Sequence, residues 1–339
     1  MLYTDRIIEN AKHSDSHVVL PEGEDVRTIT AASRLTEEGI SKVTLLGDID
    51  KILHSAQSGG ITLKEVEIIN PVSSAYEKEF GELAFDRLIK KGVNSEEAYE
   101  LSKISLNFGA LMVLSGKADA CVAGAVNTSA EVVRAALRFI GLKENTRSLS
   151  SAFLMLSPTE DKAYTFGDCG VIPDPTAEQL AELAVESADS HSMLTGEDAK
   201  IAFLSFSTMG SAKHKRVTKV IEALKIAKRI RPDLEMDGEL QFDAAVDAAI
   251  GVSKAGNSAV AGKANVLIFP DLDSGNIGYK IAQQLGGYTA LGPLLQGLKS
   301  PMHDLSRGSS ADDIVLVSAI AALQSVKNSE TIKEIHANI

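Results

Sequence analysis

The feature that most constrains the fold is the alternation of short β-rich runs with amphipathic helical patterns along the chain. Most of these runs are followed by Gly, Asp, Asn or Ser, and then by a helical pattern. This order favours an α/β fold, with mostly parallel sheets covered by helices on both faces. The predicted strands are Val18–Pro21, Val43–Gly47, Val66–Asn70, Cys121–Ala125, Ser151–Ser157, Ala163–Phe166, Ile201–Phe206, Val266–Pro270 and Thr289–Leu291.

Two helices are marked clearly by their first residues. Apolar residues recur at three- and four-residue steps from Asn94 to Leu114, with Asn94 or Ser95 as the cap. A second helix is predicted over Thr176–Ala188, where Thr176 and Gln179 have the spacing of a capping box. Parallel sheets bind ligands at the carboxyl ends of their strands, so the loops that lead into such helices are where chemistry is expected.

The chain has 339 residues, a length that favours two domains. Two segments are plausible crossings between them. Residues 143–150 lie between a helix and a strand, and residues 297–301 precede a last helix that no further strand follows. We therefore expect a discontinuous first α/β domain of residues 1–147 plus 298–339, and a second α/β domain of residues 148–297.

Charge and composition exclude several classes of protein. A formal net charge of −12 argues against a nucleic-acid binder, although local Arg and Lys residues can still attract a small anion. The two cysteines form no CxxC pair, so no metal site is predicted. Neither a signal region nor an apolar run of about 18 residues is present. We expect a cytoplasmic protein without membrane association.

Two glycine-containing loops lead from a strand into a helix. In Val122–Ser129, backbone amides could bind an anion, but an ordinary helix capped by Thr128 and Glu131, with a solvent-facing Arg134, is favoured. The loop Leu204–Ser211 precedes a basic cluster, residues 213–216. Binding of a phosphate-bearing ligand and a solvated first turn are equally compatible with it, because cations oppose the dipole at a helix N-terminus.

A third loop, Pro301–Ser310, precedes the last helix. Arg307 could bind an oxyanion through its planar fork of donors while Asp313 takes a proton. Alternatively, Ser310 and Asp313 form a helix cap and Arg307 lies in water. Spacing alone does not choose between these interpretations.

Two other groups are better explained by structure than by chemistry. The segment Phe269–Asn276 fits turn residues with a cap at Ser274 better than a magnesium site. Cys121 falls in a predicted buried strand. Cys169 has no basic neighbour in the sequence to generate a thiolate, so a covalent role is not favoured.

Taken together, these loops resemble the phosphate acetyltransferase (phosphotransacetylase) family, within the phosphate acetyl/butyryltransferases, over nearly the whole chain and in the same order. The matching motifs are Leu20-Pro21-Glu22-Gly23 with Arg27, Val122-Ala123-Gly124-Ala125, Asp168-Cys169 with Pro173-Asp174-Pro175-Thr176, Asp237-Gly238-Glu239-Leu240-Gln241-Phe242-Asp243-Ala244-Ala245, Phe269-Pro270-Asp271-Leu272, Gly292-Pro293-Leu294-Leu295-Gln296-Gly297 and Asp304-Leu305-Ser306-Arg307-Gly308.

The resemblance implies two three-layer αβα domains of isocitrate/isopropylmalate dehydrogenase-like architecture, with an active-site cleft between them. It implies a homodimer that converts acetyl-CoA and phosphate to CoA and acetyl phosphate, with coenzyme A as substrate and no bound cofactor. By motif, Ser306 corresponds to an active-site serine, Arg307 to an anion-binding arginine and Asp313 to a base. Arg87 departs from the family pattern by one position and is assigned no role.

The predicted substrate-binding residues come from the first two loops. We expect a direct attack of the CoA thiolate in a ternary complex, in preference to an acyl-Cys169 intermediate. Two alternatives stay open, a butyryltransferase-like enzyme and a non-catalytic CoA-sensing domain; no GxGxxG fingerprint supports a nicotinamide-dependent dehydrogenase. The predicted contacts are Arg134, Asn127, Thr128, Ser129, Ser207, Met209, Gly210 and Ser211.

Overall fold

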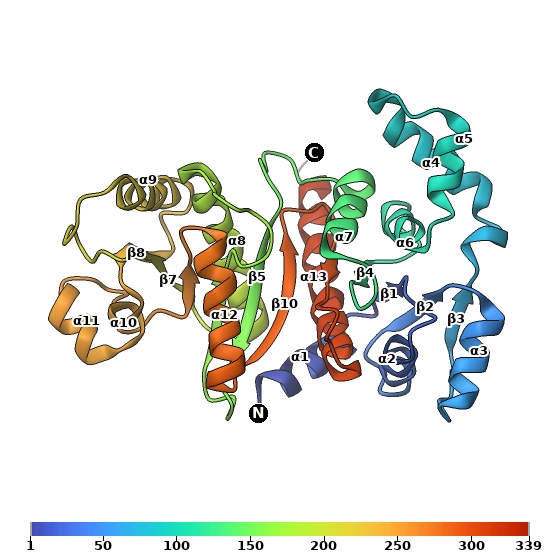
Figure 1. Ribbon diagram of the computed structural model, residues 1–339, viewed down its shortest axis with the longest axis horizontal. Coiled ribbons are helices and arrows are strands. Elements are labelled where there is room, and N and C mark those ends of the chain that lie inside the picture. The colour runs from blue at the N-terminus through green and yellow to red at the C-terminus, as the bar shows by residue number, and fades with distance from the viewer. Residues whose placement is uncertain (1, 338–339) are drawn as a thin grey trace. The chain divides into compact units, whose positions relative to one another are not determined.

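The computed structural model describes residues 2–337, with side chains described as far as residue 326 (Figure 1). The chain divides into two compact units. Unit 1 comprises Met1–Tyr3 and Glu144–Gly297, and unit 2 comprises Thr4–Lys143 and Leu298–Ile339. Each unit contains one sheet with helices packed against it, so the predicted α/β fold class is confirmed. Among the described residues, no helix combines the length and apolar character needed to cross a membrane.

The sheet of unit 2 is entirely parallel. Its central strand is buried on both faces, with Val18, Val19 and Leu20 fully inaccessible to solvent. Such a continuous apolar run is typical of a central strand in a parallel sheet. The strand order is β11 (Met302–Asp304), β4 (Ala120–Ala123), β1 (His17–Leu20), β2 (Lys42–Leu46) and β3 (Val66–Ile69).

Helices cover both faces of this sheet. In Figure 1, α6 and α2 lie on opposite sides of β1 and β2, and α13 packs against α2 and β4. The helices of unit 2 are α1 (Tyr3–Lys12), α2 (Val26–Glu37), α3 (Ile49–Ser58), α4 (Glu77–Leu88), α5 (Ser95–Ser102), α6 (Ser105–Leu114), α7 (Ser129–Ala135) and α13 (Ala311–Ala337), with the short helices Pro71–Ser73, Ile89–Lys91 and Ala136–Ile140.

The sheet of unit 1 is mixed, because β10 pairs antiparallel with β5, and β5 pairs antiparallel with β6. The remaining pairs are parallel. Its strand order is β10 (Thr289–Gln296), β5 (Ser150–Leu156), β6 (Ala163–Gly167), β9 (Val266–Ile268), β7 (Lys200–Leu204) and β8 (Glu235–Leu240).

Strand β7 shows why unit 1 has three layers. Ile201 and Phe203 belong to the core on one face of the sheet, whereas Ala202 and Leu204 belong to the core on the other. Successive side chains of a strand point to opposite faces, so both faces must be covered. The covering helices are α8 (Ala177–Thr195), α9 (Lys215–Ile230), α10 (Phe242–Val246), α11 (Ala248–Ala255) and α12 (Leu272–Gly286).

Several predicted boundaries are wrong. The helix predicted over Asn94–Leu114 is two helices, α5 and α6, because Ile104 takes an extended conformation between them. Asn94 does form the predicted capping box, and Thr176 forms one with Gln179. Helix α12 is capped by Asp271 and not by Ser274, whose backbone N–H donates to the Asp271 carboxylate. Strands β8 and β11 were not predicted.

The end of β4 comes very close to the end of β11. Gly124 follows β4 with φ at +116°, and a Cβ atom built there would lie 2.4 Å from Asp304 Oδ1 and 2.5 Å from the Leu305 backbone nitrogen. The Leu305 N–H donates to the Ala123 carbonyl at 2.8 Å. Only a glycine satisfies both the backbone conformation and this close approach.

Gly124→Ala should therefore lower the free energy of unfolding by about 3 kcal/mol or more, because it adds a steric clash to an unfavourable φ. Gly39→Ala is the matched control, since Gly39 also has positive φ (+67°) but a Cβ atom there meets nothing within 4 Å. That control should lose only about 1 kcal/mol. Urea unfolding measures both variants, and equal losses would contradict the clash.

Candidate active site

Three loops of unit 2 meet at the carboxyl edge of its sheet. They follow β1, β4 and β11, which are adjacent in the sheet. The loops comprise residues 21–25, 124–128 and 305–310. Because parallel strands end at the same edge, residues far apart in sequence are brought together there, and this edge is where open α/β sheets bind their ligands.

The loop after β4 does bind an anion, and the anion is the carboxylate of Glu22. Gly124 N–H lies 3.0 Å from each carboxylate oxygen, and Ala125 N–H donates to Oε2 at 2.8 Å. Val126 and Asn127 donate their N–H groups to Oε1 at 3.0 and 2.7 Å. We call these four N–H groups, of residues 124–127, the amide cradle. Glu22 is 8% exposed.

Arg27 joins this loop to the one after β11. Its Nη2 donates to the Ala125 carbonyl at 2.8 Å. Its Nη1 donates to the carbonyls of Arg307 and Ser309 at 2.8 and 2.9 Å. Asp25 holds the guanidinium through a bidentate contact, which lowers the pKa of that carboxyl. The backbone of the predicted catalytic segment is thus fixed from two sides.

Asp304 ends β11 and carries a buried carboxyl, 1% exposed. Neither oxygen has a well-formed hydrogen-bond partner in the described part of the chain. Burial raises the pKa of Asp304 to about 6, contacts with the Ser129 hydroxyl and the Leu305 N–H oppose this shift, and the negative charge of Glu22 adds to it. The proton is therefore held more tightly here than by an ordinary aspartate.

Ser306 and Arg307 are exposed in the loop after Asp304. Gly308 N–H approaches the Ser306 hydroxyl oxygen at 3.4 Å, and Ser309 N–H donates to the Ser306 carbonyl at 2.9 Å. Within the residues that the structure describes, the Arg307 guanidinium makes no hydrogen bond or ion pair. Its five donors are therefore available to a ligand, and a planar fork of this kind suits a phosphate or carboxylate.

Asp313 caps α13, as one of the two sequence interpretations proposed. Its Oδ2 accepts from the Ser310 N–H at 2.8 Å and from the Ser310 hydroxyl at 2.9 Å. The Asp313 N–H donates back to Ser310 Oγ at 3.1 Å. Both contacts fall on Oδ2, and Oδ1 accepts no hydrogen bond from the described residues. The cap therefore leaves one oxygen of Asp313 available to a proton.

Residues after the cradle have mixed roles. Thr128 caps α7 in a complete capping box, and its N–H and hydroxyl both contact Glu131 at 2.8 Å. These hydrogen bonds lower the pKa of Glu131, and the positive charge of Arg134 adds to the effect. Ser129 and Arg134 are exposed and Asn127 is half-buried, so these three side chains can still reach a ligand.

The loop after β7 in unit 1 also contains an internal carboxylate. Glu239, 2% exposed, accepts from the Ser207 hydroxyl at 2.7 Å and from the Gly210 N–H at 2.8 Å. Ser207 is fully buried, so its hydroxyl supports the loop instead of facing solvent. Ser211 Oγ accepts from the Thr208 N–H at 3.0 Å, and Met209 is 44% exposed.

Cys169 and Arg87 are both committed to the fold. Cys169 is fully buried, and burial together with the neighbouring Asp168 charge raises the pKa of its thiol well above the ordinary value. A thiolate is therefore disfavoured there. Arg87 donates to the carbonyls of Phe139 and Ile140, the latter at 2.7 Å, and so closes the end of a helix. No group of three or more potential metal ligands occurs among the described residues.

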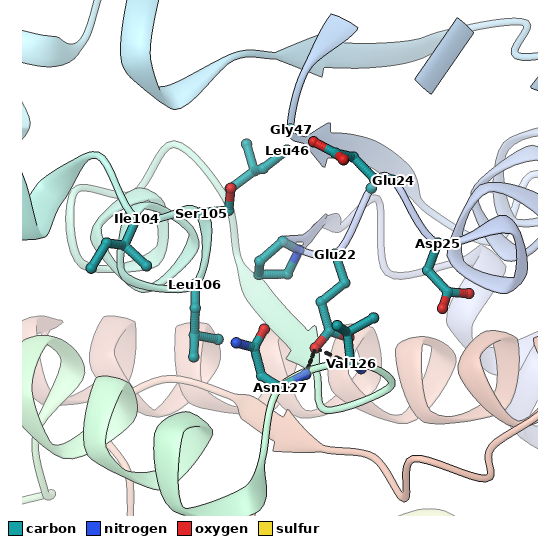
Figure 2. Close-up of a pocket in the computed structure, with 12 residues that line it drawn as sticks. Glu22, Glu24, Asp25, Leu46, Gly47, Ile104, Ser105, Leu106, Val126 and Asn127 are labelled. Atoms are coloured by element: carbon teal, nitrogen blue, oxygen red, sulfur yellow. Dashed lines mark hydrogen bonds between the residues drawn. The ribbon is translucent and has the colours of Figure 1, made fainter. Parts of the chain in front are cut away.

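A pocket of about 330 Å³ opens beside the amide cradle (Figure 2). Ile104 and Val126 line it with exposed apolar side chains, and Asn127 adds an amide. Glu24 and Asp25 place carboxylates at the same pocket. Because these charges repel anions, the pocket suits an uncharged chain better than a phosphate group.

Comparison with solved structures first defines the class. The chain resembles a 4-hydroxythreonine-4-phosphate dehydrogenase from Burkholderia phymatum with a TM-score of 0.52 at 12% identity, covering 92% of this chain and 97% of the other. At this identity the likeness concerns the fold alone. It supports the dehydrogenase-like α/β architecture predicted from the sequence.

Closer likenesses define the family. A phosphotransacetylase from Streptococcus pyogenes superposes with a TM-score of 0.91 at 42% identity, covering 96% of this chain and 98% of that one. A phosphate acetyltransferase from Acetivibrio thermocellus is 43% identical over 96% of this chain and 98% of its own length. The family model described as phosphate acetyl/butaryl transferase matches residues 2–322. The chain belongs to this family of acyltransferases.

The buried Asp304 carboxyl predicts a distinct pH dependence of stability. Its pKa rises from 3.8 to about 6 on folding. Between pH 3.8 and about 6, the folded state therefore keeps a proton that the unfolded state has released. The free energy of unfolding therefore falls as pH rises through this window, by up to about 3 kcal/mol from this group alone. Asp304→Asn should remove that contribution.

Urea unfolding from pH about 4 to 7 measures the effect as the difference between variant and wild type, which cancels the other titrating groups. Asp304→Asn should become steadily more stable relative to wild type as pH rises. Asp312→Asn, which changes a side chain that is 75% exposed, should show no such trend. Parallel curves for Asp304→Asn and wild type would contradict the raised pKa.

Proposed function

We propose that this chain is a phosphate acetyltransferase, which interconverts acetyl-CoA plus phosphate and CoA plus acetyl phosphate. The observation that carries the proposal is the 43% identity to a phosphate acetyltransferase over 96% of the chain. The site adds independent support, because a free guanidinium, a hydroxyl and a carboxylate oxygen lie within one short segment, residues 306–313.

In the direction of thioester synthesis, the CoA sulfur attacks the acetyl carbon of acetyl phosphate. A carbon–sulfur bond forms, the carbon–oxygen bond to phosphate breaks, and inorganic phosphate leaves. The thiol proton passes to Asp313, because thiolate is the competent nucleophile and free thiols ionise only near pH ~8.5. The free Oδ1 of Asp313 is the proposed acceptor.

Arg307 binds the phosphoryl group and stabilises the charge that develops on it as it departs. Ser306 donates its hydroxyl to the developing oxyanion or orients the thiol. The transfer is direct, within a ternary complex, and needs no bound cofactor. The deeply buried Cys169 thiol, whose pKa is raised by burial, is poorly suited to carry the acetyl group covalently.

We assign the remaining substrate contacts to the exposed or half-buried members of the predicted set. Arg134 offers a second cation for the phosphates of CoA. Asn127, Thr128 and Ser129 precede it at the start of α7, and Met209 and Ser211 remain proposed contacts in unit 1. Ser207 and Gly210 act on the substrate only through the loop they share, since both already bind Glu239.

We also propose that the enzyme is a homodimer in the cytoplasm. Helix α12 supports self-association, because Ile277, Ile281 and Leu285 follow one another at four-residue steps and are 57%, 53% and 84% exposed. Residues at this spacing form one face of a helix. A monomer's mass by light scattering would contradict the dimer.

The proposed function is tested with purified protein, acetyl phosphate and CoA, by following thioester absorbance. We expect phosphate-dependent acetyl-CoA formation, and a lower rate with butyryl phosphate. A preference for butyryl phosphate would instead indicate a butyryltransferase. Binding of CoA without turnover of either acyl phosphate would indicate a CoA-sensing domain and overturn the proposal.

Asp313→Asn should lower kcat by about 100-fold or more, because general bases typically contribute this much. The KM for CoA should change little, since the substitution leaves the proposed cation contacts intact. Steady-state kinetics with acetyl phosphate and CoA measure both constants. Asp312→Asn is the matched control: it removes the neighbouring carboxylate, which pairs with Arg34, and should leave kcat unchanged.

The double role of Asp313 needs a second variant. Ser310→Ala removes the hydroxyl of the helix cap but keeps the Asp313 carboxylate and its hydrogen bond from the backbone N–H of residue 310, and should lower stability by about 1 kcal/mol. If Ser310→Ala lowers kcat as much as Asp313→Asn does, the loss arises from the cap and the base assignment is wrong. Near-normal turnover of Asp313→Asn would lead to the same conclusion.

A further inference from the structure

Glu22 lies outside the proposed catalytic set, yet its carboxylate accepts more hydrogen bonds than any other carboxylate described above. Five contacts of 2.7–3.0 Å join it to the four N–H groups of the amide cradle. Figure 2 shows its side chain directed at Val126 and Asn127. Within the part of the chain that the structure describes, the carboxylate forms no ion pair with a cation, and Glu22 is 8% exposed. The backbone N–H groups therefore take the place of water and counter-ions around this charge.

We infer that Glu22 is a positioning residue for acyl transfer: its carboxylate occupies the amide cradle, holds the catalytic segment in place and keeps substrate phosphate out of the cradle. This inference rests on the proposed acetyl-transfer function for its kinetic consequence. The occupied cradle itself is a property of the fold, and it can be tested separately.

The path from Glu22 to the catalytic segment is short and continuous. The carboxylate fixes Gly124 and Ala125. A Cβ atom on Gly124 would touch Asp304 and Leu305, so this turn packs directly against the start of the catalytic segment. The Ala125 carbonyl accepts from Arg27, which in turn holds the Arg307 and Ser309 carbonyls.

Charge, and not only shape, is required in the cradle. All four partners are N–H donors, so an acceptor with two oxygens and no hydrogen matches them, whereas a glutamine would direct its NH₂ group at other donors. Hydrogen bonds from N–H groups to a carboxylate are also stronger than neutral ones. Without the carboxylate, the same donors would attract any small anion present, including the substrate phosphate.

This occupancy has a consequence for specificity. Phosphate bound by the four backbone amides would compete with phosphate bound at Arg307 and would occupy the site unproductively. The internal carboxylate removes that competing site. The anion-binding capacity that the glycine loop offers is thereby used to shape the site, and the free guanidinium of Arg307 is left as the group that recognises substrate.

The test is chemical rescue of Glu22→Ala with formate, a carboxylate small enough to refill the cradle. Glu22→Ala should lose at least about tenfold in kcat, the loss expected when buried donors are left unsatisfied. Formate should increase the kcat of this variant several-fold and raise its Tm. Formamide, a neutral analogue of similar size, should do neither.

Two further variants are compared with Glu22→Ala. Glu38→Ala removes an exposed carboxylate near the end of α2, whose partner is Arg34, and should show neither the kinetic loss nor the formate response. Glu22→Asp keeps the carboxylate on a side chain that is one methylene shorter, and should retain more activity than Glu22→Ala. The vacated cradle should also make inorganic phosphate inhibit Glu22→Ala at concentrations that do not inhibit wild type.

The inference is overturned if folded Glu22→Ala has the wild-type kcat. It is also overturned if formate raises the Tm of Glu22→Ala no more than it raises the Tm of Glu38→Ala. If Glu22→Ala does not fold, Glu22→Gln preserves the volume and isolates the charge. A lower kcat in Glu22→Gln than in Glu22→Asp then supports the inference, and equal kcat values overturn it.

The thermal readout separates this inference from the proposed function. If the wild-type protein transfers no acetyl group, the proposed function fails, but a formate-dependent rise in Tm specific to Glu22→Ala still demonstrates the occupied cradle. If the wild type is active and Glu22→Ala behaves as wild type in both measurements, the inference fails and the function stands.

Discussion

The hydrogen bonds between Glu22 and the amide cradle are the constraint on which the active edge of unit 2 depends. Parallel strands bring the loops after β1, β4 and β11 to one edge of the sheet, and each loop leaves backbone N–H groups without partners inside the sheet. A carboxylate from the first loop satisfies the N–H groups of the second. Arg27 satisfies the carbonyls of the second and third. One acidic and one basic side chain thus fix three loops without a ligand.

Unit 1 contains two further buried carboxylates that accept hydrogen bonds from the N–H groups of a loop. Glu239 accepts from the loop after β7. Asp168, 3% exposed, accepts N–H groups from Gly170, Val171 and Ile172 and the hydroxyl of Ser151. Burial raises the pKa of Asp168, and these hydrogen bonds oppose that shift. Loops that are ordered before a ligand arrives lose little conformational entropy on binding, which is the physical advantage of internal anions at a binding edge.

The sequence predicted the fold class well because apolar runs of the parallel sheet carry a strong local signal, as in Val18–Leu20. It missed β11 because Met302–Asp304 contains a His and an Asp, which are buried in the structure only through long-range contacts. His303, for example, hydrogen-bonds Gln324 on α13, and burial lowers the pKa of His303 to about 4. Strand β8 was missed for a similar reason, since Glu235–Leu240 contains two glutamates, an aspartate and a glycine. Local hydrophobicity carries no information about such partners.

Local sequence signals also failed to predict the long-range contacts of the candidate site. The motif order identified the loops, and capping spacing correctly identified Thr128 with Glu131 and Ser310 with Asp313. The sequence marks Glu22 only as part of a motif, because its partners lie more than 100 residues further along the chain. Anion binding at Gly124–Asn127 was the interpretation not favoured from the sequence; the loop does bind an anion, and that anion is a side chain of the protein itself. Spacing predicts contacts within a helical turn, whereas contacts between loops require the sheet order.

In the proposed function, Asp313 combines a structural role with a catalytic one. A capping carboxylate needs only one oxygen, and here Oδ2 receives both donors from Ser310. The cap fixes the carboxyl plane, so Oδ1 is held at a defined position relative to the backbone of residues 306–310. A base held in this way gains its effect from its position. The two sequence interpretations of this loop were therefore not alternatives: the helix cap is what would place the base.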